Sequence, residues 1–175
     1  EGAANQGAFH ESLNMAALWK LPFIVVIENN QYGISVPKTA STAVPSNDVR
    51  AAAYGIKGYY VKDNDPIDMY NVSKEAVERA RTGQGPSIIE IETYRYLGHF
   101  QGDPEVYRDK NEVTLLRQKD PIIRLRNYLL NECGVTEETI AQLENKATSE
   151  VDQAYAFARE SDYPKPEEAL EDVFV

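Results

Sequence analysis

The amino-acid sequence alternates between short apolar runs and longer stretches in which apolar residues recur at helical spacing. The short runs are rich in β-branched or aromatic residues and predict buried strands at residues 23–27, 59–61 and 87–92. The stretches with helical spacing predict helices at residues 8–18, 48–54 and 66–81. Because helices and strands alternate, the pattern predicts an α/β fold in which a parallel sheet is flanked by helices.

Two long segments of the chain show no such period. Residues 28–45 are polar and contain glycine and proline, so we expect a loop there. Residues 94–119 also lack a clear period, and they are long for a loop inside a compact domain. Loops of this length are usually functional or disordered, which makes the second segment a candidate for chemistry.

The last third of the chain reads as helical. Apolar residues at helical spacing predict helices at residues 120–132 and 136–160, and an acidic tail follows at residues 161–175. We therefore predict an α/β domain over residues 1–118, with its functional loop, and a helical C-terminal portion over residues 119–175.

Composition narrows the class of protein. The 175 residues are 42% hydrophobic and 26% charged, which is typical of a soluble globular domain. The net charge of -10 argues against nucleic-acid or anionic-membrane binding, and the longest apolar run, residues 23–27, is too short to cross a bilayer. Cys133 is the only cysteine, so an internal disulfide is excluded. The chain opens on Glu1 rather than Met, and we expect it to be part of a longer protein.

Two segments near the start of the chain are suited to a phosphate and a metal ion. Residues 1–3 open a predicted helix with small residues, and such a helix start offers free N–H groups to an anion. Residues 28–33 follow the first predicted strand, and ligands of open α/β sheets bind at the carboxyl ends of strands. Because Mg²⁺ prefers oxygen ligands, the Glu1 carboxylate, the Asn30 amide oxygen and a backbone carbonyl near Tyr32 form a candidate set. The alternative is that the asparagine pair forms an ordinary turn.

The aperiodic segment adds a second candidate. His99 lies there between glycines, although a lone loop histidine is often solvated or packed. Asp103 and Arg108 carry opposite charges in the same segment, and we expect them to pair and to order the loop. His10 falls inside the first predicted helix, where we expect a surface or subunit-contact role.

Several ordered motifs resemble one family, the alpha subunit of the E1 component of thiamine-diphosphate-dependent 2-oxoacid and acetoin dehydrogenase complexes. The family signature is GDG, a spacer, then NN. The motifs that carry the resemblance are Glu1-Gly2-Ala3-Ala4-Asn5-Gln6-Gly7, Leu18-Trp19-Lys20-Leu21-Pro22, Glu28-Asn29-Asn30-Gln31-Tyr32-Gly33, Thr93-Tyr94-Arg95-Tyr96-Leu97-Gly98-His99 and Gly102-Asp103-Pro104. The resemblance implies the C-terminal part of a thiamine-diphosphate-binding fold.

The resemblance also implies roles for individual residues. It places Mg²⁺ on the Glu1 carboxylate, the Asn30 side chain and the backbone carbonyl of Tyr32. It places thiamine diphosphate against a set of backbone and side-chain groups: Gly2, Ala3, Asn30 and His99. His99 is the implied catalytic residue. Glu1 departs from the Asp that most of the family carries, although branched-chain members also carry Glu.

The implied activity is oxidative decarboxylation of pyruvate, or oxidative cleavage of acetoin, with acyl transfer to the lipoyl domain of E2. The implied partner is an E1 beta subunit in a heterotetramer of two alpha and two beta chains, and the implied location is the bacterial cytoplasm. Three alternatives stay open: a branched-chain 2-oxoacid enzyme, an inactive fragment with an assembly role, and another phosphate-binding α/β enzyme. The last is disfavoured because neither GxxxxGK[ST] nor GxGxxG occurs.

Overall fold

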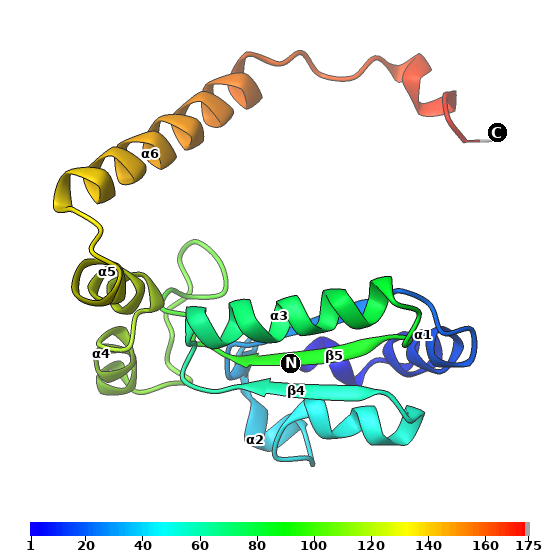
Figure 1. Ribbon diagram of the computed structural model, residues 1–175. Coiled ribbons are helices and arrows are strands. Elements are labelled where there is room, and N and C mark those ends of the chain that lie inside the picture. The colour runs from blue at the N-terminus through cyan, green and yellow to red at the C-terminus, as the bar shows by residue number, and fades with distance from the viewer. Residues whose placement is uncertain (174–175) are drawn as a thin grey trace. The chain divides into compact units, whose positions relative to one another are not determined.

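A computed structural model describes residues 1–173 of the chain (Figure 1). The residues form two compact units, Glu1–Asn127 and Tyr128–Val175. The first unit contains the sheet, and the second is helical. Helix α5 (Pro121–Glu132) runs across the division between them.

A three-stranded parallel sheet forms the centre of the first unit. Its strands are β1 (Ile24–Asn29), β4 (Lys57–Val61) and β5 (Ser87–Glu92), in the spatial order β1-β5-β4. Asn29 lies opposite Glu92 in the register, so the carboxyl ends of β1 and β5 meet at one edge. The predicted α/β class with a parallel sheet is therefore confirmed. The prediction that all three strands are buried is wrong for β1 and β4, because they are the outer strands of this sheet and leave Val26 and Tyr60 exposed.

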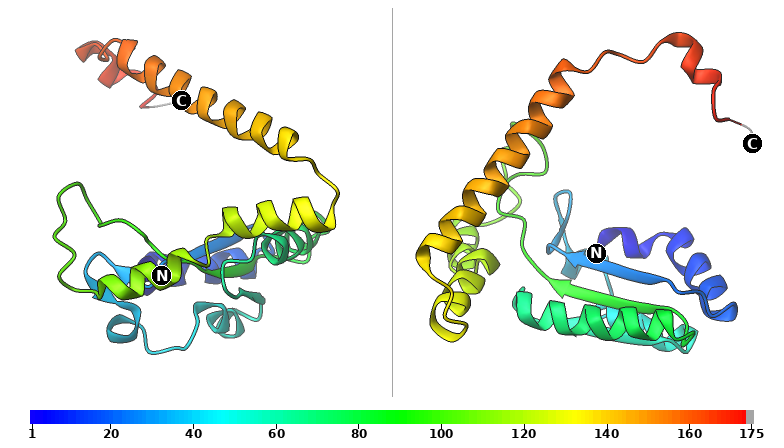
Figure 2. Two further views of the ribbon diagram at one scale, coloured as in Figure 1. Left: turned by 90° about the vertical axis from the view of Figure 1, so that its left-hand side faces the viewer. Right: turned by 45° about the horizontal axis from the view of Figure 1, so that its top comes forward.

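Helices cover both faces of this sheet (Figure 2). On one face, η1 (Gly2–Asn5), α1 (Gly7–Leu18) and η2 (Asn47–Tyr54) bury a cluster with β1 and β5: Ala4, Leu13, Ile27, Ala51 and Ile88. On the other face, α3 (Pro66–Arg81) buries a second cluster with β4 and β5: Tyr59, Val61, Ala76, Ile89 and Ile91. Strand β5 is therefore buried on both sides, which explains why its isoleucines at 88, 89 and 91 do not alternate with exposed polar residues.

Local sequence fixes where α3 begins. Asp65 is the N-cap, and its Oδ1 accepts hydrogen bonds from the backbone N–H groups of Ile67 and Asp68 at 2.9 and 3.4 Å. Pro66 occupies the first turn, where the missing N–H has no helical partner to lose. The predicted helix at residues 66–81 matches this helix.

Both segments predicted to be loops contain short elements. Residues 28–45 include the antiparallel pair β2 (Tyr32–Gly33) and β3 (Val36–Pro37), followed by α2 (Lys38–Ser41). Residues 94–119 include α4 (Lys110–Arg117), whose N-cap Asp109 accepts a hydrogen bond from Asn111 N–H at 2.8 Å. The prediction of one unbroken loop there is wrong. Helix α4 is only eight residues long, and its half-buried apolar residues, Val113 and Leu116, are too few to establish a period in the sequence.

The second unit contains α6 (Glu137–Glu160) and η3 (Pro166–Leu170). Ile140 is the buried residue of α6, whereas Phe157 is 75% exposed. The predicted tail at 161–175 includes η3, and its last two residues lie outside the described part. Within the described residues, the chain contains no helix that combines the length and the apolarity needed to traverse a bilayer.

Candidate functional site

Glu1 and Asn30 meet at the carboxyl edge of the sheet. Strand β1 ends at Asn29, so Asn30 lies where ligands of open α/β sheets bind. The backbone N–H of Asn30 donates a hydrogen bond of 3.1 Å to Oε2 of Glu1. The second carboxylate oxygen, Oε1 of Glu1, is buried and has no hydrogen-bond partner among the described residues. A buried anionic oxygen is costly to leave unpaired, and it is therefore suited to accept a ligand.

Two glycine backbones approach each other beside this pair. A Cβ added to Gly2 would lie 3.6 Å from Cα of Gly33, and one added to Gly33 would lie 4.0 Å from Oε1 of Glu1. η1 therefore lies in contact with β2 beside the Glu1 carboxylate. The sequence predicted that one helix opens at the first three residues, and this is wrong in detail: η1 is a separate short 3₁₀ turn, and α1 begins at Gly7. Gly2 is half-buried and Ala3 is exposed.

The asparagine pair forms a tight turn after β1. Oδ1 of Asn30 accepts a hydrogen bond of 3.1 Å from Tyr32 N–H, and Oδ1 of Asn29 accepts one of 3.2 Å from Gln31 N–H. These are side-chain-to-backbone contacts that asparagine favours in turns. Gln31 has a φ of 74°, in the left-handed region, so the turn depends on these contacts to hold it. Oδ1 of Asn30 keeps a second lone pair for a further partner.

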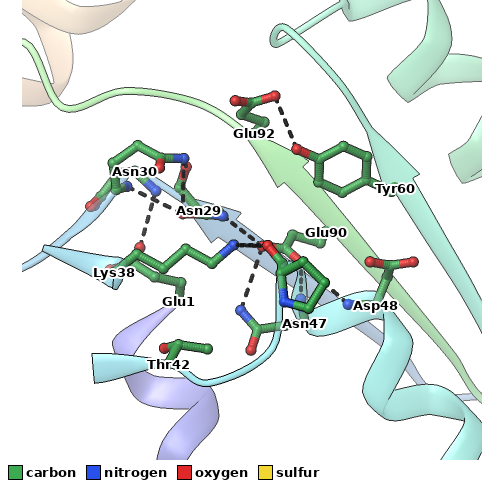
Figure 3. Close-up of polar contacts among 12 residues, drawn as sticks. Glu1, Asn29, Asn30, Lys38, Thr42, Asn47, Asp48, Tyr60, Glu90 and Glu92 are labelled. Carbon is green, nitrogen blue, oxygen red and sulfur yellow. Dashed lines mark hydrogen bonds and ion pairs between the residues drawn. The ribbon is translucent and has the colours of Figure 1, made fainter. Parts of the chain in front are cut away.

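A buried carboxylate that the sequence analysis did not predict contacts this turn through the side chain of Asn29. Glu90 is fully buried in β5, and its Oε1 accepts a hydrogen bond of 2.6 Å from Nδ2 of Asn29 (Figure 3). Its Oε2 accepts hydrogen bonds from the backbone N–H groups of Asn47 and Asp48, the latter at 3.2 Å. The signal in the sequence is a single acid in the apolar run 87–91, since an unpaired charge is not tolerated in a core.

Lys38 supplies the positive charge beside Glu90. Its Nζ lies 3.6 Å from Oε1 of Glu90 and donates a hydrogen bond of 2.6 Å to the Pro45 carbonyl oxygen. The Lys38 side chain is only 12% exposed, so both charges are largely removed from water. The backbone N–H of Lys38 donates to the Gln31 carbonyl oxygen at 2.9 Å. Lys38 therefore contacts both the buried carboxylate and the turn above it.

The ring of Tyr32 joins this turn to the segment that carries His99. Its centroid lies 5.7 Å from the Tyr107 ring and 6.3 Å from the Tyr94 ring. Its hydroxyl donates to the Glu112 carboxylate on α4 at 3.2 Å. Burial, followed by the negative charge of Glu112, raises the pKa of Tyr32, so the hydroxyl remains a donor at neutral pH.

Arg108 packs behind these rings and is 8% exposed. Its guanidinium lies 5.5 Å from the Tyr94 ring centroid and donates hydrogen bonds to the backbone carbonyls of Arg95 and Tyr96. It also pairs with the Glu105 carboxylate. The expected pairing of Arg108 with Asp103 is therefore wrong: the shorter connection within the turn brings Glu105, three residues away, to the guanidinium.

Asp103 instead organises the loop around His99. Its Oδ2 accepts hydrogen bonds from His99 N–H at 2.8 Å and from the Tyr107 hydroxyl at 2.7 Å, and its Oδ1 accepts one from Glu105 N–H at 3.0 Å. His99 is exposed, and among the described residues its side chain makes no hydrogen bond to Glu1 or Asn30. The structure thus brings Glu1, Asn30 and Tyr32 together and places His99 on a separate loop.

His10, expected on a helix surface or in a subunit contact, is half-buried. Its Nδ1 lies 2.5 Å from the Tyr54 hydroxyl, and its Nε2 lies 3.1 Å from a guanidinium nitrogen of Arg50. These contacts join α1 to η2 and give His10 a structural role on this face of the sheet.

The candidate metal set mixes one carboxylate with amide and backbone oxygens. Across the described part of the chain, no cluster of three or more His, Cys, Asp or Glu side chains is arranged to hold a metal ion. A single acid with neutral oxygens is the donor chemistry that suits Mg²⁺ when phosphates complete its coordination. The sheet edge of this α/β protein therefore gathers a carboxylate, a side-chain amide and backbone groups, which makes it the candidate ligand site.

Comparison with known proteins identifies the class more closely. Residues 1–167 match the family described as "Dehydrogenase E1 component". The chain therefore belongs to the dehydrogenase E1 component family, which confirms the resemblance seen in its motifs.

Named relatives are alpha subunits. The chain is 44% identical to the alpha subunit of acetoin:2,6-dichlorophenolindophenol oxidoreductase from Bacillus subtilis, over all of this chain and 52% of that protein. It is 40% identical to the chloroplastic pyruvate dehydrogenase E1 component subunit alpha-3 of Arabidopsis thaliana, over 99% of this chain and 41% of that protein. It is 39% identical to the pyruvate dehydrogenase E1 alpha subunit of Rhizobium meliloti, over all of this chain and 51% of that protein. The chain spans about half the length of these relatives.

Proposed function

We propose that the protein is the alpha subunit of a thiamine-diphosphate-dependent E1 dehydrogenase that acts on pyruvate or acetoin and passes the acyl group to a lipoyl domain of E2. Membership of the dehydrogenase E1 component family supports the reaction class. The names of relatives that are 39–44% identical support pyruvate and acetoin as the substrates to test first.

The single observation that carries the cofactor assignment is the state of the Glu1 carboxylate. Oε2 of Glu1 is held by Asn30 N–H, whereas Oε1 is buried without a partner among the described residues. Glu1, the Asn30 side chain and the Tyr32 carbonyl are the groups that would hold Mg²⁺. Bound Mg²⁺ would compensate the charge of Glu1 and link it to a diphosphate, which repels a bare carboxylate.

Thiamine diphosphate would lie against the backbones of Gly2 and Ala3, with Asn30 and His99 as further contacts. When bound, thiamine diphosphate supplies the carbanion chemistry that protein side chains lack. This chain would bind the diphosphate and orient the cofactor. We assign His99 the catalytic task of stabilising charge or moving a proton during acyl transfer, since its imidazole is exposed and histidine is the side chain most often used for such proton transfer.

The proposed function also implies a domain organisation for this chain and a set of partner proteins. Residues 1–118 would be the C-terminal part of a thiamine-diphosphate-binding α/β domain, and residues 119–175 a helical portion. A beta subunit would complete the cofactor site in a heterotetramer of two alpha and two beta chains. The lipoyl domain of E2 would receive the acyl group, and the bacterial cytoplasm would be the location.

Calorimetry of the complete protein tests the assignment. Full-length alpha subunit with its beta subunit is titrated with thiamine diphosphate and Mg²⁺, as the wild type and as Glu1→Gln. We expect binding by the wild type and a loss of Mg²⁺ affinity of roughly 10-fold or more in the variant, because a charged ligand becomes neutral. Glu11→Gln, at an exposed position on α1, is the matched control. Absence of binding by the wild type, or unchanged affinity in Glu1→Gln, contradicts the proposal.

A substrate panel decides the reaction. The same complex is assayed with pyruvate, acetoin and 2-oxoisovalerate and an artificial electron acceptor. Turnover of pyruvate or acetoin supports the proposal. Preference for 2-oxoisovalerate assigns the protein to the branched-chain enzymes, and inactivity on all three leaves only an assembly role.

A further inference from the structure

The central strand carries a carboxylate whose surroundings are built from distant segments of the chain. Glu90 has no exposed surface, yet it lies one strand away from the turn that bears Asn30. The groups around its two oxygens are donors: Nδ2 of Asn29, the backbone N–H groups at the start of η2, and the ammonium of Lys38. Both oxygens of the buried carboxylate are thus satisfied by donors, as a buried acid requires.

We propose that Glu90 is a positioning residue for the metal-binding turn, acting through the side chain of Asn29. This inference rests on the proposed function, because the metal is assigned there. Figure 3 shows Glu90 beside Asn29 and joined to it by a dashed line, with Asn30 on the opposite side of Asn29. The clamp is defined as Glu90, Asn29 and Lys38.

The clamp acts on both amide atoms of Asn29. Nδ2 of Asn29 donates to Glu90 at 2.6 Å, and this fixes which way the amide faces. Oδ1 of Asn29 is thereby aimed at Gln31, where it accepts from the backbone N–H at 3.2 Å and from Nε2 at 3.1 Å. These two bonds hold Gln31 at its φ of 74°, which an L-residue adopts only under constraint.

The conformation of this turn then orients the two proposed metal ligands, Glu1 and Asn30. With Gln31 held, the N–H of Asn30 points at Oε2 of Glu1, and the N–H of Tyr32 points at Oδ1 of Asn30. Outer partners of metal ligands commonly tune affinity in this way, and their removal typically weakens metal binding roughly 10- to 100-fold. Glu90 thus contacts no ligand atom but determines the orientation of Glu1 and Asn30.

Lys38 has a different part in the clamp. Its ammonium offsets the buried charge of Glu90, while its backbone N–H donates to the Gln31 carbonyl. Loss of the Lys38 side chain should therefore lower stability more than it changes the turn, since the Asn29–Glu90 contact survives. Lys38 is therefore the charge partner of Glu90, whereas Glu90 is the positioning residue.

The first readout needs no metal. In the metal-free full-length alpha subunit with its beta subunit, Glu90→Gln removes the charge at nearly unchanged volume and offers Asn29 only one carbonyl acceptor. We expect faster hydrogen exchange at the amides of Asn30, Gln31 and Tyr32, with α3 amides unchanged. Glu75→Gln, which replaces an acid that accepts from the Tyr59 hydroxyl on the far face, is the control. Unchanged exchange in the turn overturns the positioning role.

The second readout is Mg²⁺ affinity by calorimetry in the presence of thiamine diphosphate. Glu90→Gln and Asn29→Ala should each weaken Mg²⁺ binding roughly 10- to 100-fold, and the double variant should be no worse than either single one. Additive losses, or a lower melting temperature with unchanged Mg²⁺ affinity, overturn the proposal and leave a purely structural role. Where Glu90→Gln does not fold, Asn29→Ala carries the test alone.

The two proposals fail separately. A wild-type complex that binds neither Mg²⁺ nor thiamine diphosphate refutes the proposed function, and the exchange measurement still decides whether Glu90 holds the turn. A wild-type complex that binds both, with Glu90→Gln binding equally well, refutes the positioning role alone.

Discussion

The backbone N–H of His99 donates a hydrogen bond of 2.8 Å to Oδ2 of Asp103, so one carboxylate determines where the loop histidine is held. The same carboxylate accepts from Glu105 N–H and from the Tyr107 hydroxyl. Asp103→Asn replaces one acceptor oxygen by a donor and removes the charge. We expect exchange of the His99 and Glu105 amides to become roughly five- to tenfold faster, because hydrogen bonds to a charged acceptor are lost. Hydrogen exchange followed by mass spectrometry or NMR measures this.

The control for this prediction is Asp152→Asn, at an exposed position on α6. It removes the same charge from another element of the chain and should leave exchange at His99 unchanged. Equal protection of the His99 amide in wild type and Asp103→Asn would show that the loop is held by other contacts.

The Asp103 carboxyl also makes the loop sensitive to acid. The carboxylate accepts hydrogen bonds from the backbone N–H groups of His99 and Glu105 and, with a smaller effect, from the Tyr107 hydroxyl. These bonds lower the pKa of Asp103 below its ordinary value of 3.8. A lowered folded-state pKa means that the stabilisation is complete above about pH 4 and is lost as pH falls through the folded pKa. A carboxyl ¹³C titration by NMR should give a midpoint below 3.8 for Asp103, and Tyr107→Phe should raise it. A midpoint at or above 4 in the wild type contradicts this account.

Arg108 holds the base of the same loop with geometry that lysine cannot copy. Its guanidinium contacts the Glu105 carboxylate, two backbone carbonyls and the Tyr94 ring. Arg108→Lys keeps the charge but loses the planar fork, and we expect the free energy of unfolding to fall by about 1–3 kcal/mol. Arg117→Lys, whose exposed guanidinium stacks on Tyr96, should cost about 0.5 kcal/mol or less. Chemical denaturation compares them, and equal losses refute the argument.

Gly58 allows β4 to lie against η2. A Cβ at this position would lie 2.3 Å from the Asp48 carbonyl oxygen and 3.1 Å from Cβ of Ala51. Gly58→Ala should therefore lower the free energy of unfolding by about 1–3 kcal/mol, through overpacking. Gly7→Ala is the matched control, since its Cβ would meet only the Glu11 side chain at 3.4 Å, and it should stabilise by about 0.4–1 kcal/mol. Thermal unfolding that shifts both variants in the same direction contradicts the packing argument.

The parts of the fold that the sequence predicts are those in which one segment carries its own signal. The run at residues 23–27 is β-branched and apolar because β1 is a strand of the sheet, and the cap and proline at residues 65–66 mark α3 from a few neighbouring residues. Helix α4 lacks such a signal. It is eight residues long, and Val113 and Leu116, three residues apart, are its half-buried apolar residues, so the apolar spacing is too short to stand out as a period.

The candidate site likewise has a part that the sequence predicts and a part that it does not. Glu1, Asn30 and Tyr32 stand out because their residue types suit a metal at a strand end. The pairing of Glu90 with Lys38 does not, since 52 residues separate them (90 − 38) and only the fold brings them within 3.6 Å. The pairing of Arg108 with Glu105 rather than Asp103 was missed for a related reason: both acids are close in sequence, and backbone geometry decides between them.

His99 is the one proposed catalytic residue, and its loop is anchored through its backbone, not its side chain. His99→Ala should therefore leave the loop and the binding of thiamine diphosphate with Mg²⁺ largely intact. If the imidazole moves a proton or stabilises charge during acyl transfer, acylation of the lipoyl domain should slow roughly 100-fold or more. Single-turnover acylation in the alpha–beta complex measures this, beside calorimetry for binding. Gln101→Ala, exposed in the same loop, controls for a change in loop surface. Normal acylation by His99→Ala would show that the histidine takes no part in the chemistry. A loss of cofactor affinity as large as the loss of rate would make it a binding residue instead. The reason is that a group acting only in acyl transfer contributes to the rate and not to the affinity.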